Sequence, residues 1–324
     1  MPEFELPDLA DVRAAAARIG PHARVTPVFR DATLDELAGA QLHFKCEHLQ
    51  VGGAFKFRGA CNAVWTLARD EARLGVVTHS SGNHGAALAL AARTRGIPAH
   101  VVVPEGAVRA KLANIEAAGA TLHFCAPTLA AREETCARIA RETGAALVHP
   151  YADPRVIAGQ GTAALELLSQ VPDLDVVVAP VGGGGLMSGC AVVVRALSPE
   201  IVLLGAEPAG ADDAARSLQA GQRVIDVAPH TVCDGLRATI GEINFEVLRT
   251  HAVEIVTVDD PQTLAAMRLL WTHLKQTVEP SSAVVLAALL SRAARHRGKK
   301  IGLILSGGNV DLDRLFAQFF PEVH

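Results

Sequence analysis

The chain contains 324 residues, of which 50% are hydrophobic and 20% charged, and its formal net charge is −4. This length suits about two domains, and the apolar content supports a large core rather than a disordered chain. A mildly acidic balance without a basic block, with only 4% aromatic residues, argues against nucleic acid or an anionic membrane surface as a partner. A small molecule is the expected partner.

Targeting and redox features indicate a cytoplasmic protein. The first 20 residues carry acids and no continuous apolar run, so no signal peptide is expected. The chain also lacks an uninterrupted apolar stretch of about 18 residues, which argues against a membrane-spanning helix. Its six cysteines are scattered without a CxxC pair, a pattern typical of reduced and mostly buried thiols.

Short β-branched runs alternate with Ala/Leu-rich helical patterns along the chain. The expected strands cover residues 42–46, 75–78, 99–103, 121–124, 176–179, 202–206, 254–258 and 301–305. The expected helices between them include residues 83–95, 107–118, 129–142, 156–169 and 264–274. Continuously apolar strands that alternate with helices predict an α/β fold, in which parallel sheet is covered on both faces.

Two glycine-containing turns, in residues 78–90 and 176–190, each stand between a predicted strand and a predicted helix. In open α/β sheets, ligands bind at the carboxyl ends of the strands, where such turns lie. The sequence therefore predicts a site between two α/β units. The proline-containing segment 148–154 is the expected crossing from one unit to the other.

The tetraglycine Gly182–Gly185 is the strongest phosphate-binding candidate. Glycine allows close approach of the backbone, whose N–H groups at a helix start can hold a phosphate. A plain turn needs only one or two glycines. Gly183, Gly185 and Gly189 also form a GxGxxxG pattern with Glu207 after the next strand, so a nicotinamide dinucleotide is an alternative from this motif alone.

Lys56 stands between Phe55 and Phe57 at a predicted helix start. The helix macrodipole disfavours a cation there, so a purely structural lysine would lower stability. An apolar environment lowers the pKa of a lysine, because desolvation penalises the charged form. The neutral amine can form a Schiff base and then act as a base.

Two further polar turns follow predicted strands. The run Ser80-Ser81-Gly82-Asn83-His84 offers N–H groups and an amide side chain to a ligand, although a helix N-cap explains part of it. His84 taken alone suits a structural helix-start residue better than a catalytic base. Ser306 begins the second turn, Ser-Gly-Gly-Asn, at a strand end, where a capped turn is the alternative.

Taken in order, the motifs AFKFRGA, SSGNHG, VGGGGL, EPAGADD and LSGGNVDL resemble those of fold-type II pyridoxal-5′-phosphate (PLP) enzymes, and most closely serine racemases and serine/threonine dehydratases. The resemblance runs from about residue 10 to the C-terminus. It implies a tryptophan synthase β-like fold with two open, mostly parallel sheets flanked by helices, and an active site between the domains. The large domain would comprise residues 1–70 and 147–324, and the small domain residues 71–146. The lysine, asparagine and serine motifs have no role in a dinucleotide fold.

The resemblance also implies roles for individual residues. The cofactor would form a Schiff base with Lys56 beside Phe55, contact Asn83 through its 3′-oxygen, and place its pyridine nitrogen at Ser306. Its phosphate would bind Gly182, Gly183, Gly184, Gly185 and Leu186. A hydroxyl at the nitrogen does not enforce ring protonation, which suits elimination or racemisation better than transamination.

Substrate and metal contacts follow in the same way. The substrate carboxylate would meet Ser80, Ser81, Gly82, Asn83 and His84, and Arg132 would contact the entrance of the site. The segment EPAGADD resembles the divalent-cation site of serine racemases, with carboxylates from Glu207 and Asp213 and the carbonyl of Ala211. These hard oxygen ligands suit Mg²⁺, with Mn²⁺ and Ca²⁺ as alternatives, and a solvated acidic turn is the other interpretation.

We therefore predict a PLP-dependent ammonia-lyase that dehydrates L-serine or L-threonine to a 2-oxo acid and ammonia. Serine racemisation, with Ser81 as a second catalytic group, and 3-hydroxyaspartate dehydration are the alternatives, and a catalytically idle PLP-binding protein is a third. Two departures bear on racemisation. Ala86 replaces a glutamine that helps animal racemases to bind ATP, and Ala238 replaces a serine near their substrate. A homodimer is expected from the resemblance.

Overall fold

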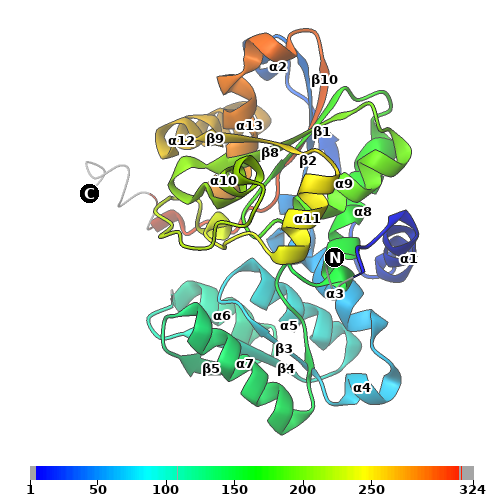
Figure 1. Ribbon diagram of the computed structural model, residues 1–324, viewed down its shortest axis with the longest axis vertical. Coiled ribbons are helices and arrows are strands. Elements are labelled where there is room, and N and C mark those ends of the chain that lie inside the picture. Colours follow the sequence, from blue (N-terminus) through cyan, green and yellow to red (C-terminus); the bar gives the residue numbers. More distant parts are fainter. Residues whose placement is uncertain (1–4, 108, 314, 316–324) are drawn as a thin grey trace.

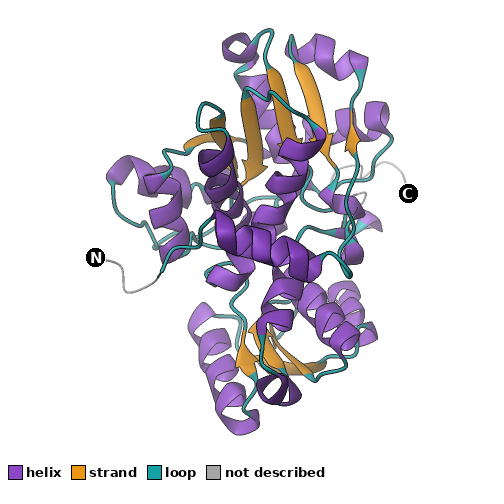
Figure 2. Ribbon diagram, turned by 90° about the vertical axis from the view of Figure 1, so that its right-hand side faces the viewer, coloured by secondary structure: helices purple, strands orange, loops and turns teal. Residues whose placement is uncertain are grey.

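The computed structural model describes residues 5–107, 109–313 and 315. Their strands form two separate sheets, one of six strands and one of four, which appear in the upper and lower halves of Figures 1 and 2. The smaller sheet is built from residues between 76 and 147, and the larger from segments on both sides of that range. The domain boundaries at 70/71 and 146/147 remain our proposal.

The larger sheet contains β1 (Val28–Phe29), β2 (Gln41–Lys45), β7 (Val176–Pro180), β8 (Val202–Pro208), β9 (Glu254–Val258) and β10 (Lys300–Ile304). The smaller sheet contains β3 (Val76–His79), β4 (Ala99–Pro104), β5 (Thr121–Cys125) and β6 (Ala146–Leu147). The strand orders are β1-β2-β10-β7-β8-β9 and β5-β4-β3-β6. Every pair is parallel except β1 with β2, as the continuously apolar strands predicted.

The helices are α1 (Leu9–Ile19), α2 (Ala32–Ala38), α3 (Lys56–Thr66), α4 (Arg69–Arg73), α5 (Asn83–Arg95), α6 (Arg109–Ala117), α7 (Leu129–Thr143), α8 (Pro154–Gln170), α9 (Gly185–Leu197), α10 (Asp213–Ala220), α11 (Glu242–Thr250), α12 (Asp260–Leu269) and α13 (Pro280–Ser291). They cover both sheets on both faces (Figure 2). Alternation along β7 shows how this works in the larger sheet. Val176 and Val178 face the α12–α13 side, whereas Val177 and Ala179 face α8 and α9.

The smaller sheet is covered in the same way. Val101 and Val103 of β4 pack against α5 and α6, and Val102 packs towards α7. Helix α3 joins the two halves, because it packs with α8 on one side and with α5 on the other. Lys56 is the first residue of this joining helix.

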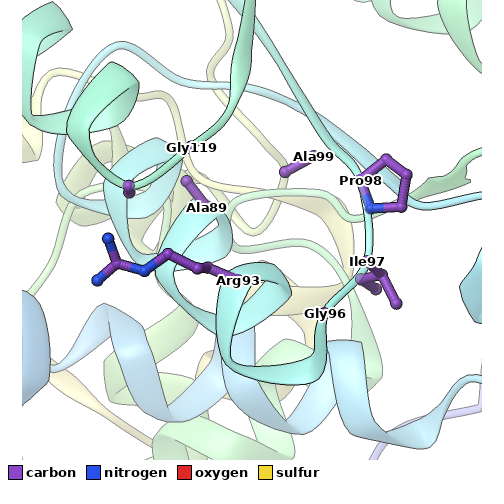
Figure 3. Close-up of a pocket in the computed structure, with 8 residues that line it drawn as sticks. Ala89, Arg93, Gly96, Ile97, Pro98, Ala99 and Gly119 are labelled. Carbon is purple, nitrogen blue, oxygen red and sulfur yellow. The ribbon is translucent and has the colours of Figure 1, made fainter.

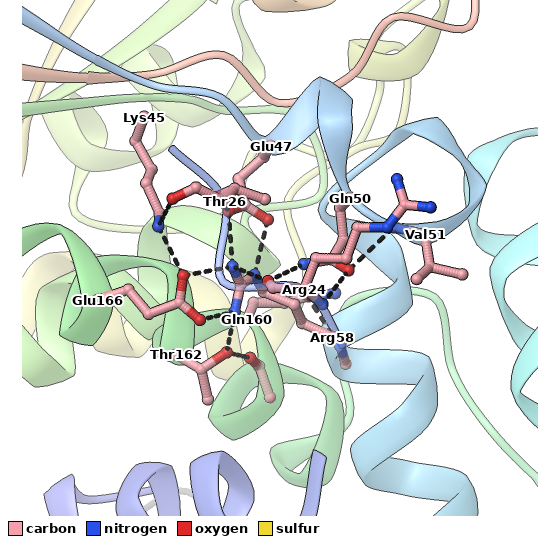
Figure 4. Close-up of polar contacts among 12 residues, drawn as sticks. Arg24, Thr26, Lys45, Glu47, Gln50, Val51, Arg58, Gln160, Thr162 and Glu166 are labelled. Carbon is pink, nitrogen blue, oxygen red and sulfur yellow. Dashed lines mark hydrogen bonds and ion pairs between the residues drawn. The ribbon is translucent and has the colours of Figure 1, made fainter. Parts of the chain in front are cut away.

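A buried ion cluster holds α3 against α8 and the end of β2 (Figure 4). The Arg58 guanidinium contacts Glu47 at 2.6 Å and Glu166 at 2.7 Å, and Lys45 Nζ lies 2.6 Å from Glu166. Lys45, Glu47 and Arg58 are fully buried. Because breaking such a pair leaves an uncompensated charge, the cluster specifies one register for the helix that begins with Lys56.

The predicted elements are largely confirmed, with differences at short or irregular segments. All eight predicted strands are present within two residues, and α5 has the predicted bounds. The two-residue strands β1 and β6 were missed, because two residues carry no periodicity. The helix predicted at 264–274 begins earlier, at α12, and its last turn is a π-helix over Leu270–Leu274.

The six cysteines are all buried and free, as expected. Within the described ranges, none of the helices is both long and apolar enough to cross a membrane.

Candidate active site

Lys56 lies where the two halves of the molecule meet. Its Nζ donates a hydrogen bond to the backbone carbonyl of Pro150 at 3.0 Å and lies 5.2 Å from the centre of the Phe55 ring. Burial lowers the pKa of Lys56 to about 8, and the carboxylate of Glu279 partly opposes that shift. The amine is therefore neutral in about a tenth of the molecules at pH 7, far more than for an ordinary lysine, and the neutral form is the one that a Schiff base requires.

The turn at Ser306 is fastened directly to the residues before Lys56. The backbone N–H of Phe55 donates to the carbonyl of Ser306 at 2.9 Å, and Ala54 forms an isolated β-bridge with Gly307. The buried hydroxyl of Ser306 lies 3.2 Å from the hydroxyl of Ser282 on α13. Two predicted motifs about 250 residues apart thus form one wall of the site.

Asn83, the first residue of α5, faces a carboxylate that sequence reasoning missed. Its Nδ2 donates to both carboxylate oxygens of Glu279, at 3.0 and 3.2 Å. Its Oδ1 accepts from Asn309 Nδ2 at 3.0 Å. Glu279 is only 4% exposed and precedes α13 in a segment without a recognisable motif. Only the fold brings it beside Asn83.

The tetraglycine passes from β7 into α9, with Gly184 in the left-handed region at φ 92°. Close packing restricts these positions further. A Cβ added to Gly183 would lie 2.4 Å from the Tyr151 ring, and one added to Gly182 would lie 2.8 Å from Leu236. Packing therefore explains part of the glycine run. Leu186 is buried in the first turn of α9, the helix whose N-terminus follows the glycines.

The turn after β3 places Ser80, Ser81 and Gly82 in half-buried positions before α5. The Ser81 hydroxyl has no hydrogen-bond partner among the residues that the structure describes. His84 is buried, and neither ring nitrogen has a hydrogen-bond partner there. Burial lowers the pKa of His84 well below its ordinary value, with Lys56 and His149 adding to the shift. The ring is neutral, and a contact of this residue with substrate would come from its backbone.

Arg132 lies half-buried on α7. Burial lowers the pKa of His79 to about 4, and the positive charge of Arg132 adds to that shift. His79 ends β3, immediately before the Ser80 turn. The charge of Arg132 also opposes the rise that burial causes in the pKa of Tyr151, whose ring lies against Gly183. The positive charge of Arg132 is therefore felt at both His79 and Tyr151.

Glu207 and Asp213 are both buried and are held by backbone amides. Glu207, in β8, accepts from the N–H groups of Ala214 and Ala215, each at 2.9 Å. Asp213, the first residue of α10, accepts from Ile240 N–H at 2.7 Å. Burial raises the pKa of Glu207 to about 8 and that of Asp213 to about 6. Two buried carboxylates without a neutralising side chain on Glu207 fit the donor set of a hard cation.

A second acid–base cluster has the composition of a metal site but the wrong hydrogen bonds. His79, Glu133 and His149 each offer one ligand atom, and these atoms lie within 4.8 Å of one another. However, His149 Nδ1 accepts the N–H of Ala152 at 2.9 Å. In a neutral imidazole the proton is then on Nε2, so neither nitrogen has a free lone pair for a metal.

A separate pocket of about 350 Å³ opens at the far end of α5 from Asn83 (Figure 3). Among the described residues that line it, Arg93 alone is ionisable, and its guanidinium donates to the carbonyl of Ala117 at 3.0 Å. None of the predicted site residues lines it.

The fold and the junction around Lys56 define the class of protein. Residues 19–307 match the family model described as pyridoxal-phosphate dependent enzyme, and the chain belongs to that family. It is 49% identical to the β-hydroxyaspartate dehydratase of Paracoccus denitrificans over 96% of this chain and 98% of that one. It is 46% identical to the serine racemase of Arabidopsis thaliana over 96% of each chain.

Solved structures agree. The structure of maize serine racemase superposes with a TM-score of 0.94 at 43% identity and covers 98% of each chain. These findings confirm the resemblance to fold-type II PLP enzymes, the α/β fold with two mostly parallel sheets, and PLP as the cofactor. The chain is an enzyme of this lyase and racemase group.

Proposed function

We propose that the chain is an ammonia-lyase that eliminates water from a β-hydroxy amino acid and yields a 2-oxo acid and ammonia. The observation that carries the proposal is the Lys56 amine, whose pKa is about 8 and whose Nζ is hydrogen-bonded only to the Pro150 carbonyl among the described residues. When bound, PLP supplies an electron sink for the α-carbon of an amino acid. Lys56 would then accept the α-proton, and the β-hydroxyl would take up a proton and leave as water.

The residues around Lys56 fit this cofactor. The Gly182–Gly185 run and the N-terminus of α9 would hold its phosphate, and Leu186 follows them in the helix. Asn83 Nδ2 would donate to its 3′-oxygen. The Ser306 hydroxyl would meet its pyridine nitrogen, where Ser282 orients that hydroxyl. Phe55 excludes water from Lys56.

Elimination is favoured over racemisation by the state of Ser81. A serine hydroxyl is a poor base unless a neighbour accepts its proton. Among the described residues, none accepts a hydrogen bond from the Ser81 hydroxyl. The nearby His84 is buried, and neither of its ring nitrogens makes a hydrogen bond, so it does not accept the Ser81 proton. Relatives named serine racemases nevertheless match over nearly the whole chain, so racemisation is the second candidate and Ser81 its second acid–base group.

The substrate carboxylate would bind the turn of Ser80 to His84, where backbone N–H groups precede α5. L-Serine and L-threonine are the first candidates. The 49% identity to a β-hydroxyaspartate dehydratase favours 3-hydroxyaspartate as a third substrate to test. The positive charge of Arg132, which acts on both His79 and Tyr151, would suit a second carboxylate.

The chain would also bind a structural divalent cation. Glu207 and Asp213 would supply carboxylates to Mg²⁺, Mn²⁺ or Ca²⁺, and the buried Ala211, in the turn between them, would supply its carbonyl. A homodimer and a cytoplasmic location complete the proposal.

The experiment supplies the purified holoenzyme with L-serine, L-threonine and L-threo-3-hydroxyaspartate separately, with Mg²⁺. We expect oxo acid to exceed D-isomer for the preferred substrate. Lys56→Ala should lose both products and the visible band of the bound cofactor, whereas Lys299→Ala, at an exposed ion pair with Asp175, should retain them. Predominant D-isomer, abolished by Ser81→Ala, would establish the racemase instead. No turnover in the presence of the visible band would support a PLP-binding protein without catalysis.

A further inference from the structure

We infer that Asn309 is a positioning residue that sets the orientation of the Asn83 amide, so that its NH₂ group rather than its oxygen points towards the cofactor. Asn309 is the last residue of the Ser-Gly-Gly-Asn turn. The inference rests on the proposed contact of Asn83 with the 3′-oxygen of PLP. It assigns a function to Asn309, for which the sequence provided only a helix-capping interpretation.

The first step is the orientation of Asn309 itself. Its side chain contacts the backbone carbonyl of Gly52 at 2.8 Å. A carbonyl oxygen can only accept, so the atom of Asn309 that faces Gly52 must be Nδ2. The same nitrogen lies 3.0 Å from Asn83, and its second hydrogen is available for that contact. Gly52 therefore defines which end of the Asn309 amide meets Asn83.

The second step transfers this orientation to Asn83. Because Asn309 donates, the atom of Asn83 that faces it must be Oδ1. At the other end, the carboxylate of Glu279 can only accept when it is ionised, so it must face Asn83 Nδ2, at 3.0 and 3.2 Å. The Gly52 carbonyl and the Glu279 carboxylate can each only accept a hydrogen bond. Together they leave one consistent orientation for the Asn309 and Asn83 amides.

The third observation is that Asn309 has little freedom to move. Its backbone N–H donates to the Glu279 carboxylate at 3.1 Å. Gly53 is in the left-handed region at φ 75°, and a Cβ added there would lie 2.5 Å from Asn309 Oδ1. Asn309 thereby connects three segments: the loop just before Lys56, the Asn83 turn and the segment before α13.

The chemical consequence concerns the remaining hydrogen of Asn83 Nδ2. One hydrogen of this NH₂ group serves Glu279, and the other can serve an anionic oxygen of the cofactor. If the amide turned over, Oδ1 would face that anionic oxygen and repel it, and Nδ2 would oppose the donating Nδ2 of Asn309. Donation to the 3′-oxygen favours the charge-separated form of the bound cofactor, which absorbs in the visible region, over the uncharged form, which absorbs in the near ultraviolet.

The test compares holoenzyme variants by absorption spectrum and cofactor dissociation constant, which do not depend on turnover. Asn309→Asp places an acceptor against Asn83 Oδ1 and so favours the turned-over amide in competition with the Glu279 carboxylate, which still accepts from Asn83 Nδ2. Asn309→Ala removes the donor and leaves Glu279 as the one remaining restraint on the Asn83 amide. We expect the near-ultraviolet fraction to rise in the order wild type, Asn309→Ala, Asn309→Asp. Cofactor binding should weaken about tenfold in Asn309→Asp, the loss of roughly one hydrogen bond.

Two controls separate this inference from its alternatives. Asn62→Ala removes an asparagine whose Nδ2 also donates to a backbone carbonyl, that of Arg155 at 2.7 Å, but outside the site. It should lower the melting temperature and leave the absorption ratio unchanged. Asn83→Ala tests the underlying contact. If it leaves the spectrum unaltered, the proposed Asn83 contact is wrong. If Asn83→Ala alters the spectrum while both Asn309 variants match wild type, the positioning role of Asn309 is wrong.

Discussion

Two regions of this molecule contain buried charged groups. In one, each charge is paired with an oppositely charged side chain, and in the other it is not. In the cluster beside α3, the cations Lys45 and Arg58 contact the carboxylates Glu47 and Glu166. Burial alone would raise the pKa of Glu47, but the adjacent Arg58 holds it below its ordinary value. At Glu207, burial raises the pKa to about 8, because the carboxylate accepts hydrogen bonds from backbone amides but has no cationic side chain beside it among the described residues.

Lys56 belongs with Glu207 in this comparison. Among the described residues its amine donates one hydrogen bond, to the Pro150 carbonyl, and burial lowers its pKa to about 8. The paired cluster is complete within the chain and serves the structure. The under-compensated groups lie where the proposal requires an external partner, a cation or the cofactor. Charge balance therefore separates structural from functional buried charges here.

The largest expected effect comes from breaking the paired cluster. Arg58→Met leaves Glu47 and Glu166 without their main cation, and it should lower the free energy of unfolding by about 3–5 kcal/mol. Urea denaturation measures this. If the variant fails to express, Glu166→Gln gives a smaller loss, because its side chain is 22% exposed. A change below about 1 kcal/mol for Arg58→Met would show that the cluster contributes little.

The next largest effect is expected when Mg²⁺ is added to the buried carboxylates Glu207 and Asp213. Mg²⁺ should stabilise the wild type, by about 2.7 kcal/mol at roughly a hundred times its Kd. Glu207→Gln should abolish the response, and Asp212→Asn, at an exposed neighbouring ion pair, should keep it. Melting temperatures with Mg²⁺ and with EDTA provide the measurement. An identical response in Glu207→Gln would remove Glu207 from the cation site.

The same carboxylate makes a prediction about pH. The folded pKa of Glu207 is raised above its ordinary value, so its contribution to stability is complete below about pH 4.5 and is lost as the pH rises through about 8. Without cation, the melting temperature should fall over that range more steeply in the wild type than in Glu207→Gln. Parallel curves for the two proteins would contradict the assignment.

A kinetic prediction follows for Lys56. Only its neutral amine attaches covalently to the cofactor, so attachment to the apoenzyme should accelerate about tenfold between about pH 7 and pH 9, with a midpoint near 8. Glu279→Gln removes a negative charge that raises this pKa, and should therefore shift the midpoint lower. Stopped-flow absorbance measures the rate. A rate that still rises steeply above about pH 9 would indicate an ordinary lysine.

The smallest effect is expected at an exposed pair. Arg138 and Glu142 form an i,i+4 ion pair on α7 at 2.9 Å, with side chains 52% and 57% exposed. Arg138→Gln should cost only about 0.3–0.5 kcal/mol, because water screens the pair. Urea denaturation of Arg138→Gln beside Arg58→Met gives the contrast directly. Similar losses for both would mean that burial does not decide the value of an ion pair here.

Local signals made much of the site predictable. The Asn83 turn, the tetraglycine and the Ser306 turn each combine a strand end with glycine or capping residues, and the Lys56 motif combines glycines with a lysine between two phenylalanines at a helix start. A few neighbouring positions therefore suffice to recognise each of them. Their order along the chain then indicated the family, which the comparisons confirm. The roles assigned to the individual residues remain proposals.

The residues that sequence reasoning missed have no local signal. Glu279, Tyr151 and Pro150 look like ordinary loop or boundary positions in the sequence, yet they meet Asn83, Gly183 and Lys56 respectively. The pairing of Lys45 with Glu166 likewise joins positions 121 residues apart. Contacts of this kind arise from the packing of complete elements, and no short window contains both partners.

The sequence by itself thus determined the alternation of strands and helices, the covered parallel sheets and the positions of the ligand-binding turns, because periodicity and glycine act over a few residues. Only the tertiary structure decided which charges are neutralised and which are not. Burial and the approach of a partner set the pKa of Lys56 and Glu207, and both depend on elements that are distant in the chain.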